Sequence, residues 1–153
     1  QRIYTRIGQD EGYANALCGV GDVYRRQFTY DEATSSYTEA QKIYARIGQD
    51  EGQANALCGL GDVYHRRYKY DEATSSYTEA QKIYARIGQD EREASTLCNL
   101  GDLYHLWGKY DEATSSYTEA QKIYARIGHD EGQAAAKQGL DYVSDEYWLW
   151  LTL

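Results

Sequence analysis

Apolar residues recur along the chain at helical spacing, and they do so twice within each stretch of 40 residues. In the stretch that begins at residue 52, Leu57, Leu60 and Tyr64 form one stripe at i, i+3 and i+7. A second stripe follows at i, i+4, i+7, i+10 and i+14 and consists of Ala73, Tyr77, Ala80, Ile83 and Ile87. Because each stripe occupies one face of a helix, every stretch predicts a pair of amphipathic helices.

The second stripe lies in a segment that occurs three times without change, at residues 31–48, 71–88 and 111–128. The repeat is therefore 40 residues long, and residues 1–8 resemble the last part of the same segment. We expect the chain to begin in the middle of a repeat. A short break at residues 67–70 leaves room only for an antiparallel hairpin between the two helices of a pair.

Glycines and acidic residues mark the expected helix ends. Gly48 is typical of the residue that stops a helix, and Asp50 with Gln53 resembles a capping box that starts the next one. We therefore expect seven or eight helices and essentially no strand. The long period further implies that the second helix of each pair is longer than the first.

The two stripes contain the same signature in every repeat. It consists of Leu17, Val20, Gly21, Tyr24, Ala33, Tyr37 and Ala40 in the first repeat; Leu57, Leu60, Gly61, Tyr64, Ala73, Tyr77 and Ala80 in the second; and Leu97, Leu100, Gly101, Tyr104, Ala113, Tyr117 and Ala120 in the third. This spacing resembles the tetratricopeptide repeat (TPR) signature, with Leu57 in place of the usual Trp and Ala85 in place of the usual Pro. The long period is similar to that of the Pins/LGN scaffold family and kinesin light chain. The amino-acid sequence of the repeats is similar to that of TPR arrays attached to fungal NACHT or NB-ARC NTPases.

The resemblance implies an all-α fold, a TPR-like right-handed superhelical solenoid of antiparallel helix hairpins. In such a fold each repeat buries its apolar face on its neighbours, so one domain spans the whole chain. We expect its parts to be a partial repeat at 1–11, full repeats at 12–51, 52–91 and 92–131, and a C-terminal capping helix at 132–153. Tyr64 and Tyr77 are expected to fill the space between the helices.

The resemblance also implies a binding surface, because TPR arrays bind protein or peptide ligands on a concave groove lined by the first helix of each pair. Carried onto this sequence, the lining residues are Asn15, Cys18, Asp22, Arg25, Arg26, Asn55, Cys58, Asp62, His65, Arg66, Ser95, Cys98, Asp102 and His105. This groove offers a row of Asp beside a row of Arg and His. The Lys and Asn pair with which some TPR domains clamp a peptide carboxylate is missing.

Charge and cysteine content narrow the function classes. A net charge of −8 argues against nucleic acid as a partner, because nucleic-acid binding depends on cationic contacts to phosphate. No run of about 18 apolar residues is present to span a membrane. The three cysteines are a repeat apart, beyond the ~7 Å limit for a disulfide, so we expect reduced thiols and a cytoplasmic location.

Metal and catalytic sites are the alternatives to a binding groove. Cys58, Asp62 and His65 share one helical face, and Cys98, Asp102 and His105 do the same in the third repeat. Residues of these types are suitable zinc ligands. The first repeat has Arg25 where the other two have His, and an arginine does not bind a metal ion. We therefore expect neither a metal nor a cofactor. No Ser-His-Asp or Cys-His grouping is supported, so we expect no enzyme.

The last residues depart from the repeat, since Lys137 and Asp141 stand where apolar and Gly residues are expected. A terminal repeat is usually atypical because no neighbour covers it. The segment that follows is rich in large apolar side chains and includes Tyr147, Trp148, Leu149, Trp150 and Leu151. We predict a protein- or peptide-binding scaffold, with a structural module that self-associates into a homo-oligomer through this segment as the alternative.

Overall fold

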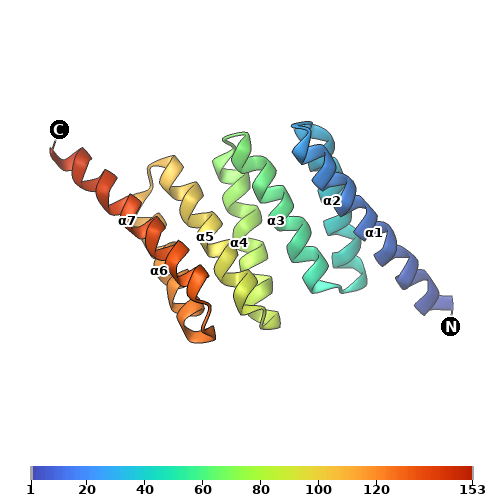
Figure 1. Cartoon of the computed structure of the whole chain (residues 1–153). Helices are drawn as coiled ribbons and strands as arrows, with labels where there is room; N and C mark the ends of the chain where they lie inside the picture. Colours follow the sequence, from blue (N-terminus) through green and yellow to red (C-terminus); the bar gives the residue numbers. More distant parts are fainter. Residues whose placement is uncertain (1, 153) are drawn as a thin grey trace. The chain divides into compact units, whose positions relative to one another are not determined.

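The computed structural model describes residues 2–152, without the side chains of Arg2, Tyr4 and Trp150. Seven α-helices follow one another in this range, and no strand occurs among the residues described (Figure 1). They are α1 (Arg2–Arg26), α2 (Tyr30–Ile47), α3 (Asp50–Arg66), α4 (Tyr70–Ile87), α5 (Asp90–Trp107), α6 (Tyr110–Ile127) and α7 (Asp130–Thr152). The predicted all-α fold of paired amphipathic helices is confirmed.

The expected alternation of short and long helices is wrong. The second helices of the pairs, α2, α4 and α6, have 18 residues each, while α3 has 17 and α5 has 18. In the pairs α3–α4 and α5–α6 the two helices are therefore almost equally long, whereas in the pair α1–α2 the first helix, with 25 residues, is the longer one.

The turns after the second helices are closed by glycine, as predicted. Gly48 and Gly128 have φ angles of 71° and 70°, in the left-handed region that glycine adopts without a steric cost. The amide of Gln49 then donates to the carbonyl of Tyr44 at 2.9 Å and satisfies the open end of α2.

The turns within the pairs use the same left-handed conformation with less suitable residues. Phe28 and Tyr68 have φ angles of 61° and 57°, whereas the equivalent residue of the third repeat is Gly108, with φ of 78°. A side chain at such an angle costs roughly 1–2 kcal/mol. The first two repeats therefore carry local backbone strain that the third one lacks.

The predicted capping box is wrong. The residue that precedes α3 is Gln49, whose side chain makes no capping hydrogen bond, and Asp50 is already the first helical residue. A carboxylate in this first turn still interacts favourably with the positive end of the helix dipole. A side chain does cap α7, because the amide of Gly132 donates to Nδ1 of His129 at 2.9 Å.

The N-terminal helix differs from the repeat-based expectation. Gly8 matches Gly48 in the sequence, yet α1 continues through Gly8 without a turn. Equivalent glycines of the repeat therefore end a helix at residue 48 and lie inside a helix at residue 8.

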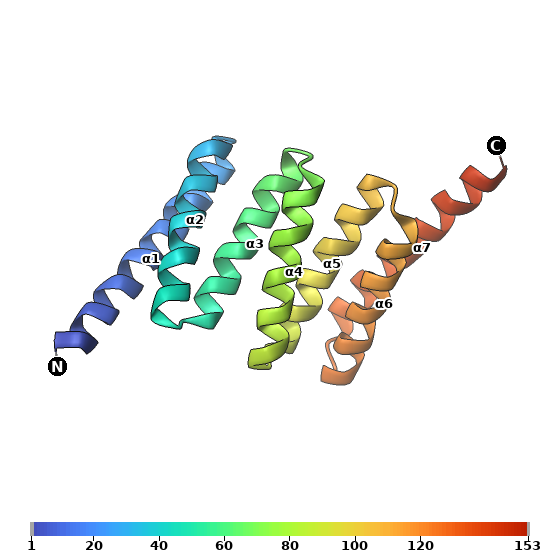
Figure 2. The same ribbon diagram turned by 180° about the vertical axis from the view of Figure 1, so that it is seen from behind.

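The chain divides into two compact units, Gln1–Ile83 and Tyr84–Leu153. In the first unit α2 packs against both α1 and α3, and in the second unit α6 packs against both α5 and α7 (Figure 2). The first unit has a core cluster of Ala14, Ala40, Ile43, Tyr44 and Ala56, and the second a cluster of Ala113, Tyr117 and Val143.

Tyrosine rings seated on glycines hold the helices together. The ring of Tyr37 is buried between Gly21 of α1 and Gly59 of α3, and a Cβ added at Gly59 would lie 2.5 Å from the Cε1 atom of Tyr37. Tyr77 is buried in the same way against Gly61. The prediction that Tyr77 fills the space between helices is confirmed, whereas Tyr64 is only half-buried.

Candidate functional site

The predicted binding residues of the first unit lie on α1 and α3. Asn15 and Arg26 are exposed on α1, and Arg66 is exposed at the end of α3. The remaining side chains are half-buried, and they are Cys18, Asp22, Arg25, Asn55, Cys58, Asp62 and His65. Those of the second unit lie on α5, where Ser95 and Asp102 are exposed and Cys98 and His105 are half-buried.

Each aspartate of the predicted row accepts a hydrogen bond from a buried tyrosine. The hydroxyl of Tyr37 donates to Asp22 at 2.5 Å, and the hydroxyl of Tyr77 donates to Asp62 at 2.7 Å. In the second unit the hydroxyl of Tyr117 donates to Asp102. The carboxylates are therefore fixed by the tyrosines that hold the helices together, so their orientation is part of the fold.

Arg25, one of the predicted binding residues, forms ion pairs within the protein. The guanidinium of Arg25 donates to Asp62 at 2.9 Å and to Asp22 at 3.3 Å, so it bridges α1 and α3. Burial lowers the pKa of Arg25, but the nearby carboxylates outweigh burial and raise it overall. The side chain of Asp22 nevertheless keeps 48% of its surface exposed, compared with 31% for Asp62.

Burial and the carboxylates act together on the tyrosines. Burial, followed by the hydrogen bond to Asp22, raises the pKa of Tyr37 well above its usual value of 10, and Tyr117 is raised in the same way beside Asp102. Burial also raises the pKa of Tyr44 to about 12, and its hydroxyl donates to Asn15 at 2.5 Å. These rings remain neutral donors at any physiological pH.

Two cysteines of the predicted surface, Cys18 and Cys98, are poor nucleophiles. All three cysteines of the chain are free. Burial raises the pKa of the Cys98 thiol to about 11, with Asp102 adding to the effect, and raises that of Cys18 as well. A thiol with a raised pKa forms little thiolate, the form that reacts and binds metals.

His105 contacts the C-terminal helix as well as lying on α5. Its Nε2 atom is 2.9 Å from Oε2 of Glu146 in α7, and its ring is tilted against Tyr110. Tyr110 in turn packs edge-on against the ring of Tyr147, with 6.5 Å between the centroids. The predicted groove residue and the predicted self-association segment are thus neighbours in the second unit.

The predicted self-association residues are largely exposed. Earlier in α7, Ala136 and Val143 are buried. Beyond them the exposed fraction is 42% for Tyr147, 65% for Trp148, 66% for Leu149 and 52% for Leu151, while the side chain of Trp150 lies outside the described residues. The first half of α7 covers the hairpin and the second half presents apolar surface.

Sequence reasoning missed the tyrosine hydroxyls as part of the site. It placed the rings in the core and the aspartates in the groove, and the structure joins the two. The signal was available as a constant separation of 15 residues between Asp22 and Tyr37, between Asp62 and Tyr77, and between Asp102 and Tyr117.

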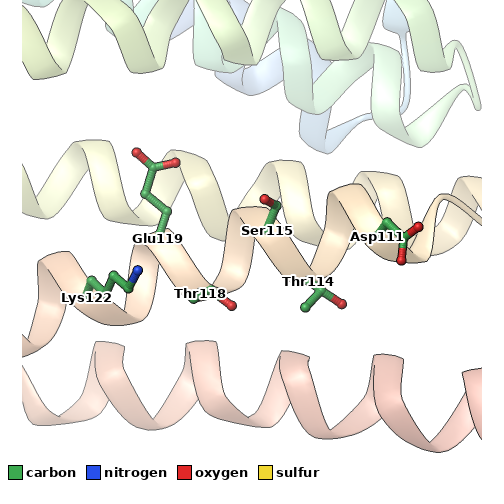
Figure 3. A pocket seen from close by; sticks show the side chains of 6 residues that line it. All are labelled: Asp111, Thr114, Ser115, Thr118, Glu119 and Lys122. Atoms are coloured by element: carbon green, nitrogen blue, oxygen red, sulfur yellow. The ribbon is translucent and has the colours of Figure 1, made fainter.

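The surface of α6 has an open hollow that was not predicted from the sequence. It is lined by Asp111, Thr114, Ser115, Thr118, Glu119 and Lys122 (Figure 3). A second hollow between α5 and α6 is lined by Glu93, Glu119, Lys122, Ile123 and Arg126. Binding pockets are usually enclosed and mostly apolar, so neither hollow resembles a small-molecule site.

Neither a metal cluster nor a membrane span occurs in the part of the chain that the structure describes. No three Cys, His, Asp or Glu side chains within residues 2–152 are grouped so that they could hold a metal ion. None of the helices in that range is long and apolar enough to cross a membrane.

Comparison with known proteins identifies the family. The tetratricopeptide repeat pattern matches residues 12–86 and again residues 52–126, which together make up more than half of the chain. The chain therefore belongs to the tetratricopeptide repeat family. Repeats of this family generally mediate protein–protein interaction and scaffolding, and they are typically not enzymes.

A solved structure supports the fold. The chain is similar to BtubC (BKLC) from P. vanneervenii, with 20% sequence identity and a TM-score of 0.66. The match covers 88% of this chain and 64% of BtubC, so the chain spans less than two thirds of that protein. No curated protein sequence matches the chain.

Proposed function

We propose that the chain is a scaffold that holds peptide or protein segments on its first helices, with one binding surface on α1 and α3 of the first unit and another on α5 of the second. The observation that carries this proposal is the set of fixed aspartates, Asp22 and Asp62 in the first unit and Asp102 in the second, each held by a tyrosine hydroxyl. Side chains that are already ordered lose little entropy on binding, which favours recognition.

The internal ion pairs decide which charges are offered to a ligand. Arg25 is occupied by Asp22 and Asp62, so acidic groups of a ligand are expected to meet Arg26 and Arg66, which are exposed. Basic groups are expected to meet the exposed parts of Asp22 and Asp102. Such pairing steers association and fixes the register of the ligand more than it raises affinity.

A charge-neutralised variant tests this proposal. In Asp22→Asn/Asp62→Asn/Asp102→Asn each amide oxygen still accepts the tyrosine hydroxyl, so the fold is kept while three charges are removed. The probe is a designed peptide of alternating Leu and Lys, followed by fluorescence anisotropy at low and high salt. We expect binding to the natural chain to weaken with salt and to fall at least tenfold in the triple variant.

The matched control removes three charges elsewhere. Glu39, Glu79 and Glu119 occupy the same exposed position in α2, α4 and α6, and Glu→Gln at all three should leave binding unchanged. If the control weakened binding as much as the aspartate variant did, the ligand would lie on the second helices and the proposed surface would be wrong.

A second candidate function is self-association through α7. It is favoured by the exposed side chains of Trp148, Leu149 and Leu151, which follow one another on the second half of this helix. Sedimentation over a range of concentrations tests it: the mass of the natural chain should rise with concentration, and that of Trp148→Ser/Leu149→Ser should not. A constant monomer mass for the natural chain would exclude this function.

A further inference from the structure

The three turns between repeats differ in the residue that stands just before the next helix. This residue is Gln49 before α3, Gln89 before α5 and His129 before α7. Neither glutamine makes a capping hydrogen bond with its side chain. His129 does, because its Nδ1 atom accepts a hydrogen bond from the amide of Gly132 at 2.9 Å. The last turn therefore has a titratable cap at a position where the other two turns have a neutral side chain.

The hydrogen bond from Gly132 fixes where the proton of the neutral His129 ring is. A backbone amide can only donate, so Nδ1 holds a lone pair and the ring proton is on Nε2. Gly132 belongs to the first turn of α7, whose amides have no partner within the helix. A proton on Nδ1 would make that atom a second donor facing the amide. It would also place a positive charge at the positive end of the helix dipole.

The other side of the His129 ring faces a carboxylate. Its Nε2 atom lies 3.6 Å from Oε1 of Glu91 on α5. Gln49 makes the equivalent contact in the first turn between repeats, where its Nε2 atom donates to Oε1 of Glu11 at 3.1 Å. The histidine thus keeps the link that glutamine makes and adds a second contact, to Gly132, that depends on a proton.

The ring of His129 also contacts the helix that precedes it. It packs on Tyr124 of α6, with 5.2 Å between the ring centroids and an interplanar angle of 38°. Tyr124 in turn packs on Gly132, because a Cβ added there would collide with its ring. The side chain of His129 keeps 36% of its surface exposed, so protons reach it from solvent. The cap, the turn and the packing of α6 on α7 therefore form one connected cluster that solvent protons can reach.

The charged groups on the helices around the ring leave Glu91 as the partner of a protonated His129. Asp90 of α5 and Arg126 of α6 pair with each other at 3.1 Å. The acidic residues 130 and 131 lie in the first turn of α7, where the helix dipole favours them. The side chain of Glu91 is 69% exposed, and an exposed ion pair contributes little to stability. This pair therefore offsets only part of the loss of the cap.

We propose that His129 is a proton-controlled cap of α7: the neutral ring holds the amide of Gly132, and the protonated ring releases it and keeps its contact with Glu91. Histidine is the side chain that ordinarily changes its charge between pH 5 and 8, so mild acidification is the signal. Acidification frees the first turn of α7, the helix whose second half presents the exposed side chains of Trp148 and Leu149. The first turns of α3 and α5, which follow glutamines, do not respond.

Nuclear magnetic resonance of the natural chain between pH 5 and 8 tests the proposal. At pH 8 the nitrogen resonances of His129 should show Nδ1 as the acceptor and Nε2 as the protonated atom. As the ring takes up a proton, the amide proton of Gly132 should shift upfield. Its hydrogen exchange, corrected for the intrinsic dependence on pH, should become roughly fivefold faster, as expected for the loss of one helix cap. A neutral ring protonated at Nδ1, or a Gly132 amide that does not follow the ring, contradicts the proposal.

Two variants isolate the cap from other effects of pH. His129→Gln gives the third turn the residue of the other two, so the chain should fold while the amide of Gly132 no longer follows pH. His105→Gln removes a histidine that contacts Glu146 near the other end of α7, and it should leave the response of Gly132 unchanged. The proposal is wrong if the response survives in His129→Gln or disappears in His105→Gln.

Discussion

The sequence Arg-Ile-Gly-Gln-Asp-Glu-Gly occurs at residues 6–12 and again at 46–52. At the second place Gly48 turns the chain with φ of 71° and separates α2 from α3, whereas at the first place Gly8 lies within the continuous helix α1. The two segments differ in what covers them. The ring of Tyr44 packs on Gly52, while a Cβ added at Gly12 would meet no atom within 4 Å.

This difference teaches that the turn between repeats is a tertiary feature. Glycine permits both the helix and the left-handed turn, so the local sequence leaves the choice open. At Gly48 the turn is accompanied by packing of the ring of Tyr44 on Gly52, whereas at Gly8 the helix continues and a Cβ at Gly12 would meet no atom within 4 Å. We infer that this packing helps to select the turn.

The largest effect on stability is expected from removing the ring of Tyr37, which packs on Gly59 of α3. Tyr37→Ala leaves a cavity between Gly21 and Gly59 and should lower the free energy of unfolding by about 3–5 kcal/mol. Tyr142→Ala, at a side chain that is 57% exposed, is the control and should change stability by less than about 0.5 kcal/mol. Urea unfolding measures both. Equal effects would mean that the tyrosine contacts do not hold the repeats together.

A substitution at each of the two equivalent glycines breaks the comparison directly. Gly48→Ala places a side chain at a left-handed position and should cost about 1 kcal/mol. Gly8→Ala should instead stabilise by about 0.5–1 kcal/mol, because alanine favours the helix that α1 forms there. Thermal unfolding of both variants would contradict the account if Gly8→Ala were the more damaging change.

A smaller gain is expected in the turns within the pairs. Tyr68 holds the left-handed conformation that Gly108 holds in the third repeat. Tyr68→Gly relieves this strain at the cost of a more flexible unfolded chain, for a net gain of about 0.5–1 kcal/mol. An unchanged or lower unfolding temperature would show that the exposed ring of Tyr68 contributes more than its strain costs.

The tyrosines also predict a pH dependence. The pKa of Tyr44 is about 12 in the folded chain and about 10 in an unfolded one, and that of Tyr37 is also raised. Above pH 10 the unfolded chain therefore loses protons first, and stability should fall from pH 10 to about 12 after a plateau at lower pH. Tyr37→Phe should make this fall shallower in urea unfolding at each pH. A slope identical to that of the natural chain would contradict the role of Tyr37.

Much of the fold could be predicted because it depends on periodic apolar stripes. The stripe from Ala73 to Ile87 lies in α4, and Gly48 and the break after Arg66 end helices as expected. The continuation of helix α1 through Gly8 and the absence of a capping box at Asp50 could not be predicted. Both depend on which side chains pack nearby, and a local pattern does not contain that information.

The candidate site was predictable only as a set of positions. Helical spacing placed Asp22, Asp62 and Asp102 on the first helices, but it could not show that tyrosines hold them or that Arg25 is already paired. These contacts join residues from different helices. Whether a ligand binds there stays a prediction.

One matched pair of variants tests most directly whether equivalent glycines of the repeat are covered by a tyrosine ring on α3 and uncovered on α1. Gly59→Ala and Gly19→Ala change equivalent residues of the repeat in the same way. In urea unfolding, Gly59→Ala should destabilise by about 1–3 kcal/mol because its Cβ meets the ring of Tyr37. Gly19→Ala should stabilise by about 0.5–1 kcal/mol because it only improves the helix. Effects of the same sign at both residues would contradict this account.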